Sequence, residues 1–301
     1  MLLTRWLIQC LLVLLSVAFF TLFERKVIGL FHLRLGPNKV GFGGLIQPLL
    51  DAFKLLSKQE LNPLTANKLA YGVTPLASLF LALFMWLLLP LTFFSFRLNF
   101  SILLFFFVGS LIVLFVLFAG WASNSKYSLL GSLRSISQSV SYEAVFSTLV
   151  VALVLLGGSF SVQRCGPSSR LLHLILFPLW IVCTLAETHR APFDFAESES
   201  ELVSGFNTEY SGAFFAFIFL SEYAVLLFSC ALIVHIFGGV ATGRTLTLTV
   251  RTLLLSFLFI WVRVTFCRFR YDLLIALAWK ILLPRALRLS LVILAGQSIS
   301  L

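Results

Sequence analysis

The chain of 301 residues is 60% hydrophobic and only 11% charged, with a mean hydropathy of +1.03. This composition excludes a soluble globular domain, in which about 25% of residues are charged. The formal charge of +10 does not indicate nucleic-acid binding, because the basic residues lie between long apolar runs, where they determine membrane topology. The sequence therefore predicts an all-α, polytopic membrane protein with a single transmembrane domain over residues 1–301.

Eight apolar stretches are candidates for membrane-spanning helices. The first is followed by Glu24, Arg25 and Lys26 without a small-residue cleavage site, so we interpret it as a retained helix and not as a signal peptide. The fifth and seventh stretches are short, and the eighth contains Arg285 and Arg288. The predicted spans lie near residues 3–23, 69–96, 98–122, 143–163, 171–187, 212–237, 246–262 and 281–300.

The basic residues predict the orientation of these spans. An even number of spans puts both termini on one side of the membrane and groups four loops on the other side, near residues 24–68, 123–142, 188–211 and 263–280. These loops hold 14 of the 22 Lys and Arg residues. By the positive-inside rule they face the inner side, and both termini are expected outside.

The first inner loop contains a predicted amphipathic helix. A polar stripe recurs at helical spacing on an otherwise apolar cylinder and consists of Gln47, Asp51, Lys54 and Lys58. Pro48 suits the first turn of such a helix. The pattern indicates a helix at the membrane interface, either as a plain anchor or against a partner. Upstream, residues 36–44 are rich in turn formers but lack the spacing of a phosphate-binding loop.

The acidic residues also gather toward the inner side. Of the twelve, Glu143 and Glu222 fall within predicted spans, the others lie in inner loops or at the ends of their helices, and no predicted outer loop contains one. An acidic side chain at mid-helix costs roughly 2.5 to 3.5 kcal/mol to insert, so it usually faces a polar interior and has a partner or a function. Charge balance against Lys and Arg explains loop acids such as Glu60, but it does not explain acids within spans.

The strongest local signal is the segment from Glu187 to Glu222, which contains seven carboxylates. An exposed acidic run is usually a solvated surface, but the interleaved Pro192, Phe193 and Phe206 indicate that this segment packs against something. Carboxylates crowded in a partly desolvated loop repel one another, which raises some of their pKa values and couples their titration. We therefore predict a set of groups that holds and passes protons. A Ca²⁺ or Mg²⁺ site is the weaker alternative, because EF-hand spacing is absent.

The Cys and His residues do not indicate a redox centre in this chain. The five cysteines are scattered without a C-x-x-C pair, which argues against a zinc site or an iron–sulfur cluster. His173 and His235 fall near outer helix ends, which is the minimum for one haem, but single histidines in helices are more often packed or hydrogen-bonded. We therefore predict no metal and no cofactor bound by this chain.

Seven motifs between residues 24 and 284 are long and specific enough to indicate a family. They are residues 24–26, 34–41, Gln47-Pro48 with Asp51 and Lys54, 120–127, 141–143, 187–210 and 268–272. Together they resemble chain 1 of NADH:ubiquinone oxidoreductase, the respiratory complex I, and its bacterial counterparts. The resemblance implies that the inner loops join two peripheral-arm subunits to enclose a quinone chamber. It also implies ubiquinone as substrate, and NADH, FMN and iron–sulfur clusters in partner subunits, so that this chain alone has no complete active site.

The resemblance further implies roles for individual residues. It implies an acidic path toward the adjacent proton-pumping membrane subunits through Glu143, Glu187, Asp194, Glu197, Glu199, Glu201, Glu209 and Glu222. It implies a quinone chamber bordered by Glu24, Arg25, Arg34, Asp51, Lys54, Arg134, Arg190, Arg268, Arg270 and Asp272. The pattern of the residues alone also singles out the acids.

Four positions depart from the usual pattern of that family. Gln59 stands beside Glu60 where the family commonly has Glu, and His189, Ser198 and Cys267 replace the usual Asn, Gly and Pro. No role is carried over to Gln59 or Glu60. His189 either packs or adds a titratable group near the acids.

The composition and the resemblance together suggest where the protein works. The 33 Phe and only two Met residues are typical of the base bias of an organelle genome. We therefore expect a multi-pass protein of the mitochondrial inner membrane with its termini on the intermembrane-space side, in contact with lipids and other complex I subunits. The alternatives are a bacterial plasma membrane, a related subunit of a membrane-bound hydrogenase or plastid-type complex, and a secondary transporter, for which the two halves show no convincing repeat.

Overall fold

The computed structural model describes residues 2–61, 63–89, 99–162, 170–194, 205–238 and 245–300. The regular structure of these residues is helical throughout. The α-helices are α1 (Leu2–Phe31), α2 (Gln47–Ser57), α3 (Lys68–Met85), α4 (Ser101–Ala122), α5 (Lys126–Gly157), α6 (Arg170–Glu187), α8 (Gly212–Phe237), α9 (Thr245–Thr265), α10 (Tyr271–Ala276) and α11 (Leu283–Ser300). Short 3₁₀ turns occur at Phe42–Gly44, Trp86–Leu88 and Gly205–Asn207, and a π-helical turn at Leu277–Leu282 joins α10 to α11.

Six helical stretches in the described residues are long and apolar enough to cross a membrane. They are Trp6–Phe31, Lys68–Leu88, Ser101–Ala122, Lys126–Gly157, Gly212–Phe237 and Leu246–Thr265. The predicted class, a polytopic helical membrane protein, is therefore confirmed. The fifth predicted span corresponds to α6, of which Ile175–Glu187 is a shorter apolar stretch, and the eighth corresponds to α11, which contains two Arg residues. The count of eight spans stays a prediction.

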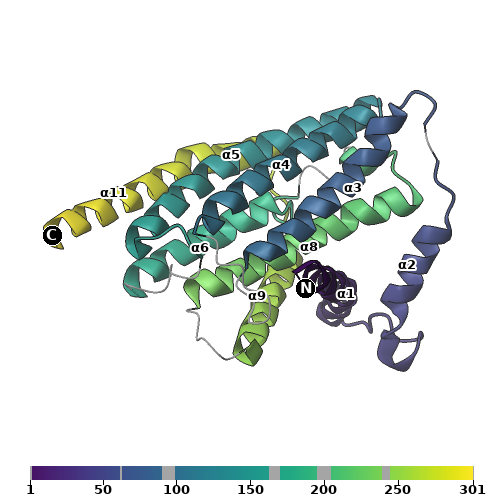
Figure 1. The fold of residues 1–301 in the computed structure, drawn as a ribbon, viewed down its shortest axis with the longest axis horizontal. Helices are drawn as coiled ribbons and strands as arrows, with labels where there is room; N and C mark the ends of the chain where they lie inside the picture. Colours follow the sequence, from purple (N-terminus) through teal and green to yellow (C-terminus); the bar gives the residue numbers. More distant parts are fainter. Residues whose placement is uncertain are drawn as a thin grey trace.

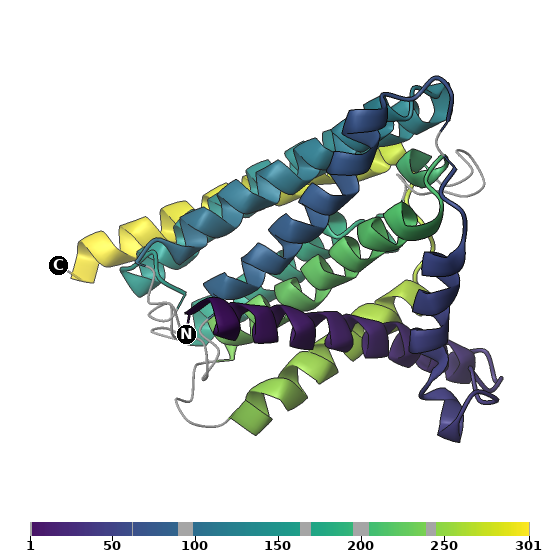
Figure 2. The same cartoon turned by 45° about the vertical axis from the view of Figure 1, so that its right-hand side comes forward.

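The helices form an elongated bundle (Figure 1). Within it α4 packs between α3 and α5, α8 packs on α3, and α11 runs along α5. Helix α1 crosses the bundle at an angle and contacts α8 and α9, while α2 stands across one end and contacts α1 and α8 (Figure 2). The N-terminal end of α1 and the C-terminal end of α11 lie on the left of that view and α2 lies on the right.

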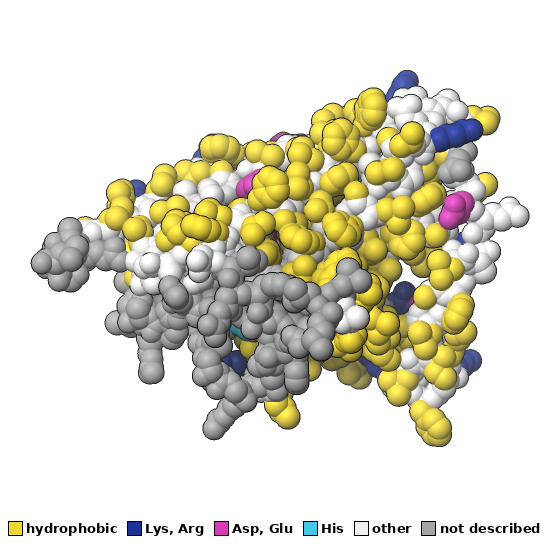
Figure 3. Space-filling model, in the orientation of Figure 1, with side chains coloured by type: hydrophobic (Ala, Val, Ile, Leu, Met, Phe, Trp, Pro, Cys, Tyr) yellow, Lys and Arg dark blue, Asp and Glu magenta, His cyan; other side chains and the backbone are white. Residues whose placement is uncertain are grey.

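The interior of the bundle is packed with aromatic and aliphatic side chains. Phe146 and Trp180 meet edge to face with ring centroids 4.4 Å apart, and Phe105 stacks on Phe228 at 5.6 Å. The outer surface is also apolar: hydrophobic side chains cover most of the visible described face in Figure 3, and basic side chains gather near its ends. A surface of this kind is suited to lipid and not to water.

The predicted amphipathic helix is present as α2, and Pro48 lies in its first turn as expected. Other boundaries were predicted too short. Helix α1 continues past residue 23 to Phe31, so Glu24 and Arg25 lie on a helix and not in a loop. Helix α5 begins at Lys126 and not at 143, so most of the predicted loop 123–142 is helical. Most of the last predicted inner loop beyond Arg270 is helical as well.

The early start of α5 has a physical reason. This part of the sequence is rich in serine, which lowers its hydropathy, yet serine hydroxyls along it find partners inside the helix. Ser135 Oγ donates to the carbonyl of Ser132 at 2.8 Å, and Ser139 Oγ donates to the carbonyl of Ser135 at the same distance. Because these groups are satisfied locally, the serine-rich turns can be buried at little cost.

Candidate functional site

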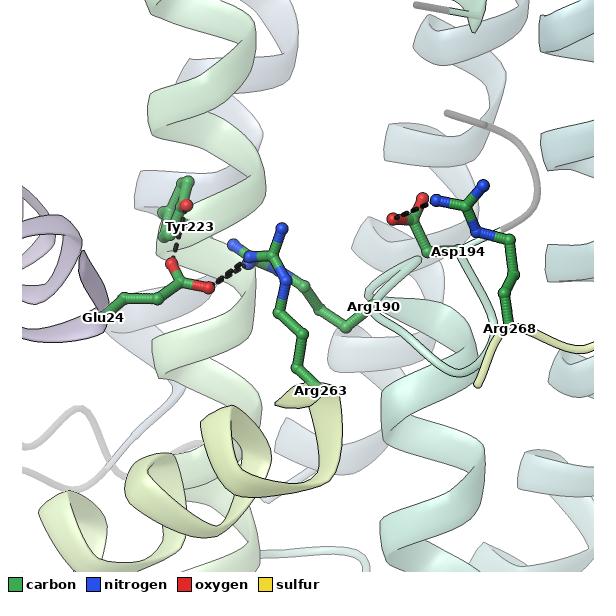
Figure 4. Close-up of polar contacts among 6 residues, drawn as sticks. All are labelled: Glu24, Arg190, Asp194, Tyr223, Arg263 and Arg268. Carbon is green, nitrogen blue, oxygen red and sulfur yellow. Dashed lines mark hydrogen bonds and ion pairs between the residues drawn. The ribbon is translucent and has the colours of Figure 1, made fainter. Parts of the chain in front are cut away.

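A buried carboxylate, Glu24 on α1, is held by side chains from three other parts of the chain (Figure 4). Its Oε1 accepts a hydrogen bond from Arg190, 2.7 Å away in the loop after α6, and another from Arg263 near the end of α9. Its Oε2 accepts a 2.8 Å hydrogen bond from the hydroxyl of Tyr223 on α8. Glu24 is only 4% exposed. We call Glu24, Arg190, Tyr223 and Arg263 the Glu24 cluster.

The charges of the Glu24 cluster do not cancel. Two guanidinium groups face one carboxylate, so the cluster carries a formal excess of one positive charge. The guanidinium of Arg190 also lies 4.3 Å from the ring centroid of Tyr223, a cation–π contact that helps to hold it in place. A partly buried positive charge attracts a group that becomes electron-rich.

The loop between α6 and the 3₁₀ turn at Gly205–Asn207 is described as far as Asp194, and this part is anchored against the segment after α9. The backbone N–H of Phe269 donates to the carbonyl of Pro192 at 3.0 Å, and the rings of Phe193 and Phe269 stack with centroids 5.8 Å apart. Arg268 lies 3.8 Å from Asp194 (Figure 4). Burial raises the pKa of Asp194, and the charges of the nearby arginines 268, 263 and 190 oppose that shift.

The buried amide of Gln138 on α5 fixes the same loop from the other side. Its Nε2 donates to the carbonyl of Phe193 at 2.8 Å and to the carbonyl of Ala186 at 3.0 Å. Side chains or backbone of α1, α5, α8 and the segment after α9 thus contact the short stretch from residue 186 to residue 194. Contacts on several sides therefore fix the position of residues 186–194.

The basic and acidic residues nearer α2 are more exposed. Arg25 on α1 forms a 2.6 Å ion pair with Asp51 on α2, and Asp51 also accepts a 3.0 Å hydrogen bond from Gln47. The side chain of Arg25 is 55% exposed, in contrast to that of its neighbour Glu24. This pair ties α2 to the end of α1 and leaves the guanidinium accessible to a partner or ligand.

A cavity lies inside the bundle between α3, α4, α5, α8 and the end of α6. About 70 Å³ of it is open to the centres of water molecules, and a single water needs about 10–15 Å³ by that measure, so the cavity has room for several. Three titratable side chains line it, from Glu187, His189 and Glu222. Its hydroxyl groups come from Thr74, Ser78, Ser135, Ser139, Thr188 and Ser221, and the rest of its wall is mainly apolar.

His189 lines this cavity, and its side chain is half-buried. Its Nε2 lies 3.4 Å from the hydroxyl of Ser139, and its buried Nδ1 forms no hydrogen bond with any residue that the structure describes. Burial lowers the pKa of His189 to about 4, so the ring is neutral at neutral pH. A neutral imidazole has one donor and one acceptor nitrogen, and water in the cavity is a suitable partner for Nδ1.

The structure brings together some of the acids that the sequence singled out. Glu187 and Glu222 share the cavity, and Glu143 on α5 is close enough to Glu187 for the two carboxylates to repel each other. Glu209 precedes α8, where its carbonyl accepts a 2.6 Å hydrogen bond from Tyr71, whose ring stacks on that of Tyr210. The predicted Glu197, Glu199 and Glu201 lie outside the described residues.

The residues expected around a quinone chamber fall into separate groups. Glu24 and Arg190 are joined in the Glu24 cluster, Arg25 pairs with Asp51, and Arg268 pairs with Asp194, one of the acids. Arg270 and Asp272 form an exposed pair at 3.3 Å, Arg34 and Lys54 are exposed, and Arg134 on α5 is half-buried.

Sequence reasoning missed Tyr223 and Arg263 as partners of Glu24. Arg263 follows directly on the apolar run of α9, and Tyr223 follows an intramembrane acid, so both were visible as polar groups beside apolar ones. Their common partner, Glu24, is 239 and 199 residues away in the sequence, and no local pattern indicates it.

Metal ligation has little support in this part of the chain. Within the described residues, no three His, Cys, Asp or Glu side chains come together as metal ligands would. His235 is buried in α8, and the side chain of His173, its expected partner for a haem, lies outside the described residues.

Fold and sites together define a polytopic helical membrane protein with ionisable side chains held inside its bundle. A family profile described as NADH dehydrogenase matches residues 5–294. NADH-ubiquinone oxidoreductase chain 1 of Bradypus variegatus is 45% identical over 300 residues, which cover 96% of this chain and 94% of the relative. The protein of the same name from Heterololigo bleekeri is 48% identical over 288 residues, or 93% and 92% of the two chains. That from Anopheles gambiae is 46% identical over 280 residues, or 91% and 89%. The chain therefore belongs to the NADH dehydrogenase family, with relatives named as chain 1 of NADH-ubiquinone oxidoreductase.

Proposed function

We propose that this chain is the chain 1 subunit of mitochondrial complex I, and that it forms the quinone chamber with peripheral-arm subunits. In this proposal ubiquinone is the substrate, while NADH, FMN and the iron–sulfur clusters belong to partner subunits. The chain couples quinone reduction to proton translocation by the adjacent membrane subunits. It spans the inner membrane with both termini on the intermembrane-space side.

The single observation that carries the coupling role is the reach of the segment from Glu187 to Asp194. Glu187 and His189 line the cavity, Arg190 binds Glu24, and Asp194 lies beside Arg268. One stretch of eight positions therefore contacts both the cavity acids and the arginine-rich groups assigned to the chamber. A change of charge or position at the chamber groups therefore alters the surroundings of the cavity acids directly, and the reverse also holds.

The Glu24 cluster suits the chamber side of this mechanism. Reduction of a quinone adds electrons and leaves its oxygens negative until protons arrive. A formal excess of positive charge in a partly buried cluster stabilises that charge more than water would. Arg25 and Asp51 are accessible at the end of α1 and are suited to guide the headgroup. As the quinone becomes negatively charged, the guanidinium of Arg190 is attracted by both the quinone and Glu24.

The cavity is suited to proton transfer. Carboxylates in an apolar interior respond strongly to a nearby change in charge, because the field is poorly screened there. Glu187 and Glu222 exchange protons through water in the cavity, and Glu143 senses the charge of Glu187. The acids Asp194, Glu197, Glu199, Glu201 and Glu209 complete the path between chamber and membrane arm.

A native gel tests this function. Membranes solubilised in mild detergent are separated, stained for NADH-dependent dye reduction, and the active band is analysed for this chain by mass spectrometry. We expect the chain in a very large NADH-active assembly. Finding it only alone, or only in an assembly without NADH activity, would contradict the proposal and favour a hydrogenase-type subunit or a transporter.

A further inference from the structure

We propose that His189 is a proton-carrying residue of the cavity, which exchanges protons with Glu187 and Glu222 through the water held there. This inference deepens the proposed function and rests on it. It assigns a role to a buried titratable group that the acidic path does not include.

The geometry of the ring is the first argument. Nδ1 is shielded from bulk solvent and forms no hydrogen bond within the described chain, while Nε2 lies 3.4 Å from Ser139 on α5. A buried polar atom left without any partner is destabilising, so a water between Nδ1 and a neighbouring carboxyl is expected. The ring then faces water on one side and a hydroxyl on the other.

The backbone is the second argument. His189 has a φ of 49°, in the left-handed region that few residues other than glycine adopt without cost. This conformation ends α6 and turns the chain from Glu187 toward Arg190, so the imidazole lines the cavity while the next residue binds Glu24. Residues held in such conformations are concentrated at functional sites.

The charges around the ring allow the transfer. In the described chain, the titratable groups that share the cavity with His189 are Glu187 at the end of α6 and Glu222 on α8; the parts of α3 and α4 that line it contribute only uncharged side chains. The other charged residues on the packed elements and the adjoining loop are Lys68 on α3, Lys126, Arg134 and Glu143 on α5, Arg170 at the start of α6, and Arg190. Two carboxyls at the same cavity stabilise a transient imidazolium when either is ionised.

The proton balance closes within the cavity. Nδ1 accepts a proton from a protonated carboxyl or from the water beside it, which gives an imidazolium and leaves the donor one charge more negative. Nε2 then releases its proton to cavity water beside the hydroxyl of Ser139, which passes it to whichever of Glu187 and Glu222 is ionised, and the ring returns to its neutral form as the other tautomer. Rotation or back-exchange resets the ring, and no oxidant or reductant is consumed.

The first test is His189→Asn in the assembled complex, with His32→Asn as the control. Asn tolerates a positive φ and keeps a polar side chain, and His32 is exposed beyond the end of α1. His189→Asn restores the residue that is usual in the family, so we expect translocation to persist. We expect its pH profile to change and its solvent deuterium isotope effect to increase, with quinone affinity retained. The control is expected to match the wild type. An unchanged pH profile and isotope effect in His189→Asn would overturn the inference.

The second test does not depend on the folding of a variant. Infrared difference spectra of the wild-type complex are recorded on quinone reduction, with histidine ring-labelled to identify imidazole bands. We expect a histidine band that reports the change of tautomer and persists in His32→Asn, and its absence from the wild type would contradict the inference. The inference and the proposed function fail differently. If Glu222→Gln uncouples the complex and His189→Asn leaves the pH profile and the isotope effect unchanged, only the role of His189 is wrong. If neither variant has an effect, the acidic path itself is wrong.

Discussion

Arg190 donates a 2.7 Å hydrogen bond to Glu24, which lies 166 residues earlier in the chain, and both side chains are largely buried, at 15% and 5% exposure. This pair joins α1 to the loop after α6, and Tyr223 and Arg263 add α8 and α9 to the same point. The architecture around the predicted chamber therefore depends on one carboxylate.

Glu24→Gln should destabilise the protein. The substitution removes the only carboxylate of the cluster and leaves two guanidinium groups facing each other, and loss of one partner from a buried ion pair costs about 3–5 kcal/mol. We expect a clear fall in the temperature of half-inactivation of the detergent-solubilised complex. Asp272→Asn is the control, because the pair with Arg270 is 74–79% exposed and such pairs contribute about 0–1 kcal/mol. Equal stability of both variants would contradict the role given to the cluster.

Arg25→Ala should affect the quinone and not the fold. The ion pair of Arg25 with Asp51 is 55% and 36% exposed, so its loss costs at most about 1 kcal/mol. We expect normal assembly, a higher KM for quinone and altered inhibitor sensitivity in steady-state assays. Arg25→Lys retains the charge and should be closer to the wild type. Kinetics indistinguishable from the wild type in the alanine variant would argue against a position at the chamber.

Gly131→Ala should strain the wall of the cavity. A methyl group at Gly131 on α5 would lie 2.7–2.8 Å from backbone atoms of Gly205 and Phe206, and Phe206 lines the cavity. Overpacking against backbone typically costs about 1–3 kcal/mol, which thermal inactivation of the complex would report. Gly296→Ala on α11 is the matched control, because a methyl group there would meet no described atom within 4 Å and a helical alanine is favourable. If Gly131→Ala leaves thermal inactivation unchanged, the turn at Gly205–Asn207 shifts easily to make room for the methyl group.

Acid should destabilise the wild type in part through His189. Its pKa is about 4 in the folded chain and about 6.5 when unfolded, so the unfolded state binds an extra proton between these values. His189 makes its full contribution to the free energy of unfolding above pH 6.5. This contribution, up to about 3 kcal/mol, is lost as the pH falls toward 4. We expect thermal inactivation measured from pH 7.5 to about pH 5 to show a smaller acid loss in His189→Asn than in the wild type. An identical pH dependence would exclude a buried neutral imidazole.

Local patterns predicted much of the fold. The apolar run at 212–237 coincides with α8, and the polar stripe from Gln47 to Lys58 became α2, because hydropathy and helical periodicity are properties of neighbouring residues. The first half of α5 was predicted as a loop, because hydropathy counts serine hydroxyls as polar even where they bond to the preceding turn.

The candidate site was only partly predictable. Glu143, Glu187 and Glu222 stood out because acids in or beside apolar spans are costly wherever they are placed. The partners of Glu24 could not be deduced, since its contacts with Tyr223 and Arg263 depend on how α1, α8 and α9 cross. The cavity could not be predicted from the sequence either. His189 and Glu222 are 33 positions apart, and they line the same cavity only because the helices pack together.

The most direct test of the proposed coupling is the ratio of protons translocated to quinone reduced in a Glu222→Gln complex reconstituted into vesicles. Glu60→Gln, at an exposed loop position, is the control. We expect Glu222→Gln to assemble with normal NADH dye reductase activity, while coupled quinone reduction and proton translocation fall sharply and the control behaves as the wild type. Wild-type turnover and an unchanged ratio in Glu222→Gln would contradict the claim that the acids of the cavity couple quinone reduction to proton translocation.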